Sequence, residues 1–215
     1  MKDVFIIGTG GLAREVASIV AILSRKGILG RFSGFIANQD DEIGKVYSSG
    51  VVIGSDKKIP FGTEDVDVII AIGHSKIKSK VHDKYKNIDN ISFPNVIDPR
   101  SNIDLNGFSI GIGNIITSGV FISCDVKIDN FCLINWNSTI GHDVIIKSYA
   151  VVNPGARVSG FSNIAENVLI GANSVILENI LIGSNVSIGA GAVVTKNVGE
   201  GLIMVGVPAK EKISL

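Results

Sequence analysis

Residues 134–158 read INWNSTIGHDVIIKSYAVVNPGARV, and every sixth residue of this stretch is Ile or Val. The same spacing holds from Ile110 to Val194, so that fifteen consecutive sixth positions carry a β-branched aliphatic side chain without an exception. A repeat of period six is typical of parallel β-helices, in which each coil buries its inner face only against the neighbouring coils. Fifteen hexads, taken three to a triangular coil, predict five coils.

The residues around each repeat position indicate a narrow prism with tight corners. Two places before the aliphatic residue, the side chain is small or medium-sized, as at Ser138, Val144 and Ala150, and we expect it to point inward. The residue that follows the aliphatic one is often Gly, Asn or Asp, as at Gly141 and Asn153. Such residues suit tight corners and positive φ angles, so we expect the corners at these positions.

The N-terminal part of the chain follows another pattern, in which short apolar runs alternate with amphipathic segments. Strands are predicted at 3–8, 32–37 and 67–73, and helices at 12–27 and 75–87. This alternation favours a small Rossmann-like parallel α/β sheet. We therefore predict an α/β domain over residues 1–94, followed by a β-helix domain with a C-terminal tail over residues 95–215.

The composition argues against several classes of partner. The 215 residues include 20 basic and 20 acidic side chains, which gives no electrostatic basis for binding nucleic acid or an anionic membrane. No stretch reaches the roughly 20 apolar residues of a membrane-spanning helix, and the first residues lack the pattern of a signal peptide. Cys124 and Cys132 do not match a zinc-binding spacing. We expect a cytoplasmic protein with no metal, no membrane insertion and no nucleic-acid partner.

His142 is the one histidine of the repeat segment, and it is followed directly by Asp143. The pair lies between the repeat positions Ile140 and Ile146, where a corner is expected, so its side chains are displayed rather than buried. The ordinary pKa of histidine lies near neutral pH, which suits a general base, and a neighbouring carboxylate can orient the imidazole and stabilise the imidazolium. His142 is thus the candidate catalytic base and Asp143 its candidate partner.

The hexads, the ending MVGVPAK (204–210) and the opening IIGTGGLARE (6–15) carry a resemblance that covers essentially the whole chain. The chain resembles the left-handed β-helix of hexapeptide-repeat acyltransferases. Within them it is similar to the bacterial acetyltransferases of nucleotide-linked amino sugars or sialic acid, the bacillosamine- and perosamine-type group of glycan biosynthesis. This resemblance implies acetyl-CoA as co-substrate and a homotrimer in which the cofactor lies between adjacent β-helices. In that group a His-Glu pair stands where His142 and Asp143 stand here.

The resemblance also implies two sets of binding residues. The cofactor would contact small residues of the repeat, and Lys196 or Lys210 is a further candidate for contact with its phosphates. The implied cofactor set is Asn153, Gly160, Ala172, Ala190 and Gly191. The nucleotide-sugar set is Gly8, Gly10, Gly11, Asn38, Gly73, His74 and Ser75.

The glycine loop by itself indicates a phosphate site, because it follows a strand and opens a helix whose first N–H groups are exposed. It departs from a dinucleotide motif, since Ala13 stands at the third glycine position. The following strand ends in Ala37 and Asn38, where the resembled group often has acidic residues. This departure leaves recognition of the base and ribose open.

We consider four functions. The first is N-acetylation of a nucleotide-linked 4-amino-4,6-dideoxy sugar, and the second is O-acetylation of sialic acid or a related sugar hydroxyl. A third is a non-catalytic nucleotide-sugar-binding protein. A β-helical carbonic anhydrase would need three histidines on zinc, but the repeat holds only His142. The nucleotide and the role of Trp136, at a sugar pocket or a subunit interface, stay open.

Overall fold

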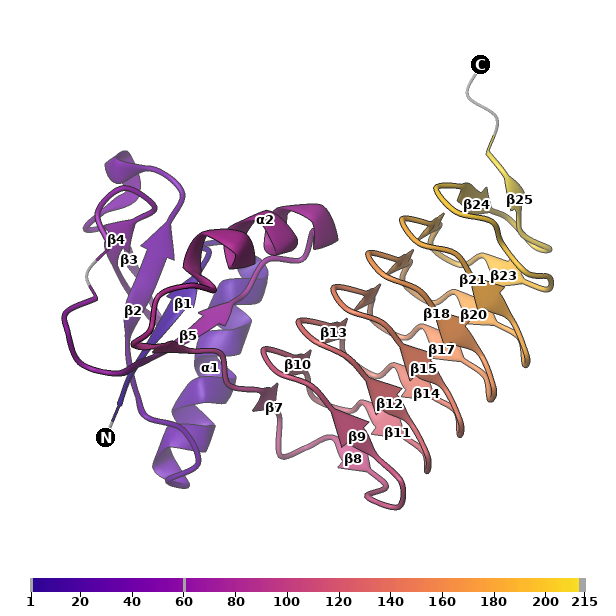
Figure 1. The fold of residues 1–215 in the computed structure, drawn as a ribbon, viewed down its shortest axis with the longest axis horizontal. Helices are drawn as coiled ribbons and strands as arrows, with labels where there is room; N and C mark the ends of the chain where they lie inside the picture. Colours follow the sequence, from indigo (N-terminus) through magenta and orange to yellow (C-terminus); the bar gives the residue numbers. More distant parts are fainter. Residues whose placement is uncertain (1, 60, 213–215) are drawn as a thin grey trace. The chain divides into compact units, whose positions relative to one another are not determined.

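The computed structural model describes residues 2–59 and 61–212. The chain divides into two compact units, Met1–Val96 and Ile97–Leu215. The first unit is an α/β sheet and the second is a β-helix, drawn in indigo to magenta and in magenta to yellow (Figure 1). The predicted fold class, an α/β domain followed by a left-handed parallel β-helix, is confirmed.

The first unit is built on a six-stranded sheet with the order β3-β4-β2-β1-β5-β6. Its strands are β1 (Asp3–Ile7), β2 (Arg31–Ala37), β3 (Val46–Tyr47), β4 (Gly50–Ser55), β5 (Val66–Ile70) and β6 (Ile91–Ser92). The central strand β1 pairs in parallel with β2 on one side and β5 on the other, and only β3 runs antiparallel to its neighbour β4. The loops after β1 and β5 therefore leave the same edge of the sheet at a switch in strand order, where α/β folds bind ligands.

Two α-helices and one short 3-10 helix connect these strands: α1 (Gly11–Arg25), η1 (Asp40–Glu42) and α2 (Ser75–Tyr85). Helix α1 buries one apolar stripe, which includes Val16, Val20 and Leu23, because these residues recur at helical spacing. Gly27 follows it with φ 71°, the left-handed conformation that ends helices. None of the helices in the described residues is both long and apolar enough to cross a membrane.

The second unit is a β-helix whose three faces are sheets of two- and three-residue strands. The first face holds β7 (Val96–Ile97), β10 (Ile115–Ile116), β13 (Leu133–Ile134), β16 (Val151–Val152), β19 (Leu169–Ile170), β22 (Ser187–Ile188), β24 (Ile203–Val205) and β25 (Lys210–Glu211). The second holds β8 (Asn102–Ile103), β11 (Phe121–Ile122), β14 (Thr139–Ile140), β17 (Arg157–Val158), β20 (Val175–Ile176) and β23 (Val193–Val194). The third holds β9 (Ser109–Ile110), β12 (Lys127–Ile128), β15 (Ile145–Ile146), β18 (Asn163–Ile164) and β21 (Leu181–Ile182).

The hexad repeat builds the core of this β-helix. Strands pair in parallel with the strand one coil later, so that Ile140 aligns with Val158 and Ile146 with Ile164. From Ile116 to Val194 every repeat position is buried, and the residue two places earlier, such as Val144, is buried beside it. The sequence pattern therefore identified both inward columns correctly.

The corners differ from the prediction in one respect. Positive φ angles do not fall on the residue directly after the aliphatic one; they fall three places after it, at every sixth residue from Gly107 to Gly191. The glycines directly after the aliphatic position serve another purpose. A Cβ on Gly141 would lie 2.6 Å from the backbone nitrogen of Gly160, so this glycine allows two coils to approach closely. The prediction assigned positive φ angles to these glycines, whereas in the structure they lie where the backbones of two coils approach closely.

The β-helix structure predicts that substitutions at two adjacent residues of β21 lower the free energy of unfolding by very different amounts. Ile182 points inward and is 2% exposed, whereas Leu181 points outward and is 53% exposed. Ile182→Ala is expected to lower the free energy of unfolding by about 2–5 kcal/mol, because it leaves a cavity between coils. Leu181→Ala, the matched control, is expected to cost no more than about 1 kcal/mol. Urea denaturation followed by circular dichroism measures both values, and equal losses would contradict the inward assignment.

Candidate active site

His142 and Asp143 lie at the corner between β14 and β15, where the sequence placed them. The scaffold fixes the backbone on both sides: the Asp143 N–H donates to the carbonyl of Cys124 one coil earlier at 3.2 Å, and the Phe161 N–H one coil later donates to the carbonyl of His142 at 3.0 Å. Asp143 has φ 60°, so it occupies the left-handed position of its corner. Both side chains project from a backbone that the repeat holds in place.

The two side chains form a hydrogen-bonded pair. Nδ1 of His142 lies 2.9 Å from Oδ2 of Asp143, and the two side chains are 47% and 43% exposed. In the neutral imidazole an Nδ1–H donating to the carboxylate leaves the lone pair on Nε2, which can accept a proton from a ligand. This is the arrangement a general base requires, and the carboxylate would stabilise the imidazolium that forms.

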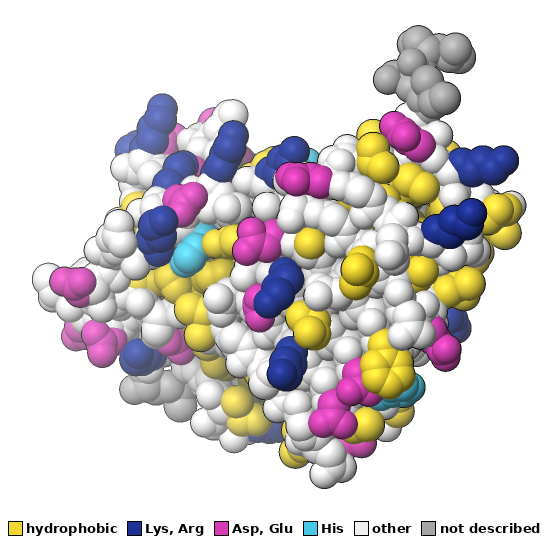
Figure 2. Space-filling view, turned by 45° about the vertical axis from the view of Figure 1, so that its right-hand side comes forward, with side chains coloured by type: hydrophobic (Ala, Val, Ile, Leu, Met, Phe, Trp, Pro, Cys, Tyr) yellow, Lys and Arg dark blue, Asp and Glu magenta, His cyan; other side chains and the backbone are white. Residues whose placement is uncertain are grey.

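Two residues of the next coil hold the imidazole ring. Gly160 is buried beneath it, and a Cβ there would lie 2.6 Å from Cε1 and 2.9 Å from Nε2 of His142. Phe161, 55% exposed, meets the ring edge to face with centroids 4.9 Å apart and an interplanar angle of 82°. Gly160 was predicted to contact the cofactor; in the structure its missing side chain makes room for the candidate base. Figure 2 shows a surface histidine with acidic and hydrophobic side chains beside it at the lower right of the view.

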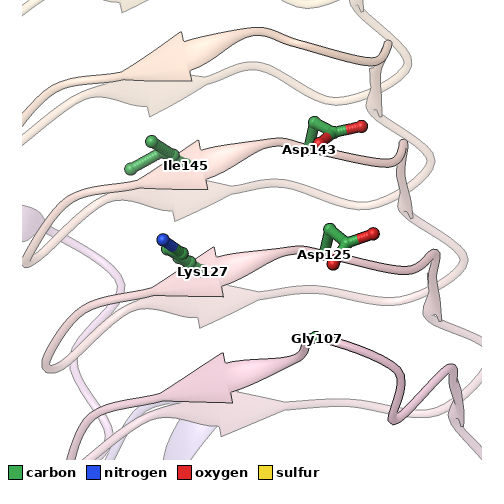
Figure 3. A pocket seen from close by; sticks show the side chains of 5 residues that line it. All are labelled: Gly107, Asp125, Lys127, Asp143 and Ile145. Atoms are coloured by element: carbon green, nitrogen blue, oxygen red, sulfur yellow. The ribbon is translucent and has the colours of Figure 1, made fainter.

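A pocket of about 260 Å³ adjoins the pair on the side of the third face. It is lined by Gly107, Asp125, Lys127, Asp143 and Ile145 (Figure 3). The carboxylates of Asp125 and Asp143 project from successive coils in the same direction, while Lys127 and Ile145 come from strands β12 and β15. The orienting carboxylate of the pair therefore borders a polar hollow large enough for a small group.

The other predicted cofactor residues lie along a different edge of the prism. The corners that follow the first face contain Ala172, Ala190 and Gly191. Trp136, which is 43% exposed, lies at an earlier corner of the same edge. Asn153 directly precedes a corner of the same edge, where its carbonyl accepts a hydrogen bond from Ser138. Gly160, beside His142, stands apart from them. The second face separates the two edges, so one chain does not bring the predicted cofactor set together.

A second cavity, of about 330 Å³, lies at the C-terminal end of the β-helix. It is lined by Val194, Thr195, Lys196, Asn197, Met204, Pro208, Ala209 and Lys210. Both lysines that the sequence suggested for phosphate contact thus border one cavity, and no carboxylate is among its lining residues. This charge and the apolar wall would suit an anionic group attached to an apolar chain.

The predicted nucleotide-sugar residues lie mainly at one edge of the α/β sheet. Gly8 follows β1 with φ 116°, and a Cβ there would lie 2.9 Å from the carbonyl oxygen of Ala71, so the loops after β1 and β5 abut. A Cβ on Gly10 or Gly11 would meet nothing within 4 Å, which leaves open space above the start of α1. Asn38 follows β2 and is exposed.

Both helix starts at this edge are suited to an anion. The N-cap residues Gly10 and His74 make no side-chain capping hydrogen bond, and neither α1 nor α2 has an acidic residue in its first turn. The first N–H groups of a helix attract phosphate under these conditions. Gly73, His74 and Ser75 stand at the start of α2, beside the glycine loop.

Sequence reasoning missed several polar residues near the glycine loop. The hydroxyl of Thr9 donates to Oε2 of Glu42 at 2.8 Å. The guanidinium of Arg14 and the ammonium of Lys45 each lie 5.3 Å from the ring centroid of Tyr47. The acidic run 40–42, which begins three residues after the end of β2, was the available signal, but it follows no periodic pattern.

Among residues 2–59 and 61–212, no group of three or more His, Cys, Asp or Glu side chains is arranged to hold a metal ion.

The contact between His142 and Gly160 leads to a prediction that is independent of any activity. Gly160→Ala is expected to displace the imidazole of His142 from its place against this coil, because the added Cβ would overlap the ring. The change should appear as a shift of the His142 ring resonance in NMR spectra, with the resonances of His74 and His82 unmoved. Gly199→Ala, where a Cβ would meet only Leu202 Cδ1 at 3.8 Å, is the control. An unchanged His142 resonance in Gly160→Ala would show that the ring does not lie against this glycine.

Comparisons with known proteins match both units. Residues 3–85 match the family model of the PglD N-terminal domain, and residues 161–196 match that of the bacterial transferase hexapeptide (six repeats). A GDP-perosamine N-acetyltransferase of Escherichia coli O157:H7 is 33% identical over 106 residues, which are 49% of this chain and 47% of that enzyme. In this match the chain spans about half the length of the curated relative.

Solved structures match over nearly the whole chain. WeeI from Acinetobacter baumannii AYE is 26% identical with a TM-score of 0.88, covering 99% of this chain and 100% of that one. PerB from Caulobacter crescentus, in complex with CoA and GDP-perosamine, is 24% identical with a TM-score of 0.87, covering 99% and 98%; this likeness shows the fold. The resemblance to the bacillosamine- and perosamine-type group is confirmed, since residues 3–85 match the model of the PglD N-terminal domain and residues 161–196 match that of the bacterial transferase hexapeptide.

Proposed function

We propose that this protein is an acetyl-CoA-dependent N-acetyltransferase that acts on the amino group of a nucleotide-linked 4-amino-4,6-dideoxy sugar. The observation that carries this proposal is the His142–Asp143 pair, whose Nδ1–Oδ2 hydrogen bond leaves Nε2 of an exposed imidazole available as a base. The N-acetyltransferase name of the E. coli relative and the CoA and GDP-perosamine bound by PerB support the same class of reaction. The product would enter glycan biosynthesis.

His142 would remove the proton of the sugar amine while the new N–C bond forms. Acetyl-CoA, when bound, supplies the acetyl group on a thioester. The imidazolium would be stabilised by Asp143 and could return its proton to the departing thiolate, so that the base is regenerated after each turnover. Gly160 and Phe161 hold the ring in place, which keeps Nε2 directed at one position.

The cofactor would bind along the β-helix, with its phosphates near the C-terminal cavity. Lys196 and Lys210 border that cavity, and its apolar wall of Met204, Pro208 and Ala209 fits an apolar chain. The small corner residues Ala172, Ala190 and Gly191 would leave room for the rest of the molecule. The two lysine charges and the apolar wall support this placement.

Two copies of the chain would be needed to complete this groove. His142 and the small-residue edge lie on opposite borders of the second face, so the edge of one subunit would meet the His142 corner of the next. Phe121, Trp136 and Phe161 on this face and its borders are 47%, 43% and 55% exposed, and exposed aromatic side chains of this kind mark interaction surfaces. We therefore propose that copies of the chain associate through this face, as the homotrimer that the resemblance implies, and that the protein acts in the cytoplasm.

A thiol-release assay tests the reaction. Full-length protein is incubated with acetyl-CoA and UDP-, dTDP- or GDP-linked 4-amino-4,6-dideoxy sugars, and with sialic acid as a hydroxyl acceptor. Release of CoA with an amino sugar, with the amide product identified by mass spectrometry, is expected. Release with sialic acid alone would indicate O-acetylation, and no release with any acceptor would contradict an acetyltransferase.

In the same assay, His142→Ala is expected to lower kcat/KM by about 10²–10⁴-fold, because it removes the general base. Asp143→Ala should lower kcat/KM by a smaller factor, since the imidazole keeps Nε2 but loses its orienting partner. Circular dichroism and light scattering confirm that each variant keeps the fold and the trimer. A loss of only a few-fold for His142→Ala in a folded trimer would exclude a general-base role.

The C-terminal cavity gives a separate prediction about the cofactor. Lys196→Ala and Lys210→Ala are each expected to raise the KM for acetyl-CoA by about tenfold, the loss of one charge-assisted hydrogen bond, while the KM for the amino sugar stays constant. Lys212→Ala removes an exposed lysine outside the cavity and serves as the control. Equal effects of all three variants would indicate a general loss of positive charge rather than a phosphate site.

A further inference from the structure

The nucleotide site of this chain lacks a carboxylate at the position where such sites ordinarily carry one. In α/β units with a glycine loop, an acidic residue at the end of the second strand accepts hydrogen bonds from the ribose hydroxyls. Here β2 ends at Ala37 and is followed by Asn38, so neither residue offers a negative charge. The structure supplies a carboxylate from elsewhere.

Glu42 reaches the glycine loop from the short helix η1. Oε2 of Glu42 accepts a hydrogen bond of 2.8 Å from the hydroxyl of Thr9, which stands between Gly8 and Gly10 in the loop itself. This is the one side-chain hydrogen bond of Glu42 within the part of the chain that the structure describes. A carboxylate offers about four lone-pair sites, so Glu42 keeps the capacity to accept further hydrogen bonds.

The position of Glu42 is fixed by the segment around it. Asp40, two residues earlier, accepts a hydrogen bond from Ser55 at the end of β4 and pairs with Lys58 at 3.4 Å. The hydrogen bond from Ser55, assisted by Lys58, holds the pKa of Asp40 below its ordinary value, so this carboxylate stays charged and the attachment persists at neutral pH. Helix η1 is thereby tied to the sheet, and the carboxylate of Glu42 is held in front of the loop.

We propose that Glu42 binds the ribose of the substrate, and that the substrate is accordingly a ribonucleotide-linked sugar, carried by a ribonucleoside diphosphate such as GDP or UDP rather than by dTDP. This inference rests on the proposed function. The open N-terminus of α1 at Gly10 and Gly11 suits the phosphates. The donors of a nucleotide that lie nearest to its phosphates are the ribose 2′- and 3′-hydroxyls, and a carboxylate one hydrogen bond from the loop is placed to accept from both.

Nearby cations balance the negative charge that Glu42 adds. Arg14 lies in the first turn of α1, with Nε 3.4 Å from the carbonyl of Gly10, and its guanidinium shares the ring of Tyr47 with Lys45. Two positive side chains therefore stand beside the same loop as one carboxylate. The diphosphate of a nucleotide can contact Arg14 and Lys45, while its neutral ribose donates hydrogen bonds to Glu42.

Calorimetric titration of the full-length protein tests this assignment without the sugar. The ligands are GDP and 2′-deoxy-GDP, and UDP and 2′-deoxy-UDP, which differ only in the 2′-hydroxyl. The unaltered protein is expected to bind the ribonucleotide of the preferred pair about tenfold or more tightly, as for a hydrogen bond to a charged group. Glu42→Gln should reduce this ratio to about twofold or less. The glutamine carbonyl can still accept the hydrogen bond from Thr9, so this variant keeps the loop in place.

Asp41→Asn is the matched control, because it removes the same charge from the adjacent exposed residue of η1, and it should leave the ratio unchanged. Equal binding of ribo- and deoxyribonucleotides by the unaltered protein, or a ratio that survives Glu42→Gln, would overturn the role of Glu42. A protein that binds none of these nucleotides and releases no CoA with any nucleotide-linked amino sugar would instead contradict the proposed nucleotide-sugar function, and with it this inference. Acetyl transfer to a dTDP-linked sugar in preference to the GDP and UDP forms would also overturn it.

Discussion

The close stacking of successive coils is the constraint on which the β-helix depends. Each strand has only two residues in most coils, and it pairs in register with a strand one coil away. One inward Ile or Val and one smaller inward residue fill the space between three faces, so the prism has no room for an irregular coil. Because of this regularity, each outward residue has a fixed position, and the sequence predicts which residues of the neighbouring coils lie beside it.

The repeat could be recognised from sequence because burial enforces it at every coil. Ile140, Ile146 and their inward neighbours Ser138 and Val144 were placed correctly, since only a side chain of suitable size fits between the coils. The corners were placed less accurately, because Gly, Asn and Asp satisfy two different needs. Gly141 is required by the approach of the next coil, whereas Asp143 takes the positive φ; composition alone does not separate these needs.

The candidate site residues were also easier to predict in periodic segments of the sequence than in irregular ones. His142 stood out because it is the one histidine of a strict repeat, and the glycine loop stood out because it joins a predicted strand to a predicted helix. Glu42 did not stand out, since its segment has no periodicity and its role comes from a hydrogen bond across 33 positions of sequence to Thr9. Such a contact depends on how β2, η1 and the loop meet, which a pattern along the chain does not encode.

The geometry of the His142–Asp143 pair follows from three adjacent positions of the scaffold. The repeat forces a left-handed residue at each corner, and at this corner that residue is a carboxylate preceded by a histidine. The imidazole can then lie against the next coil only because Gly160 stands there without a side chain. Among the described coils, this combination of a histidine, a left-handed aspartate and a glycine of the next coil against the ring occurs at this corner alone. A β-helix that supplies rigid corners at every sixth residue therefore needs only these three residues to display an oriented imidazole.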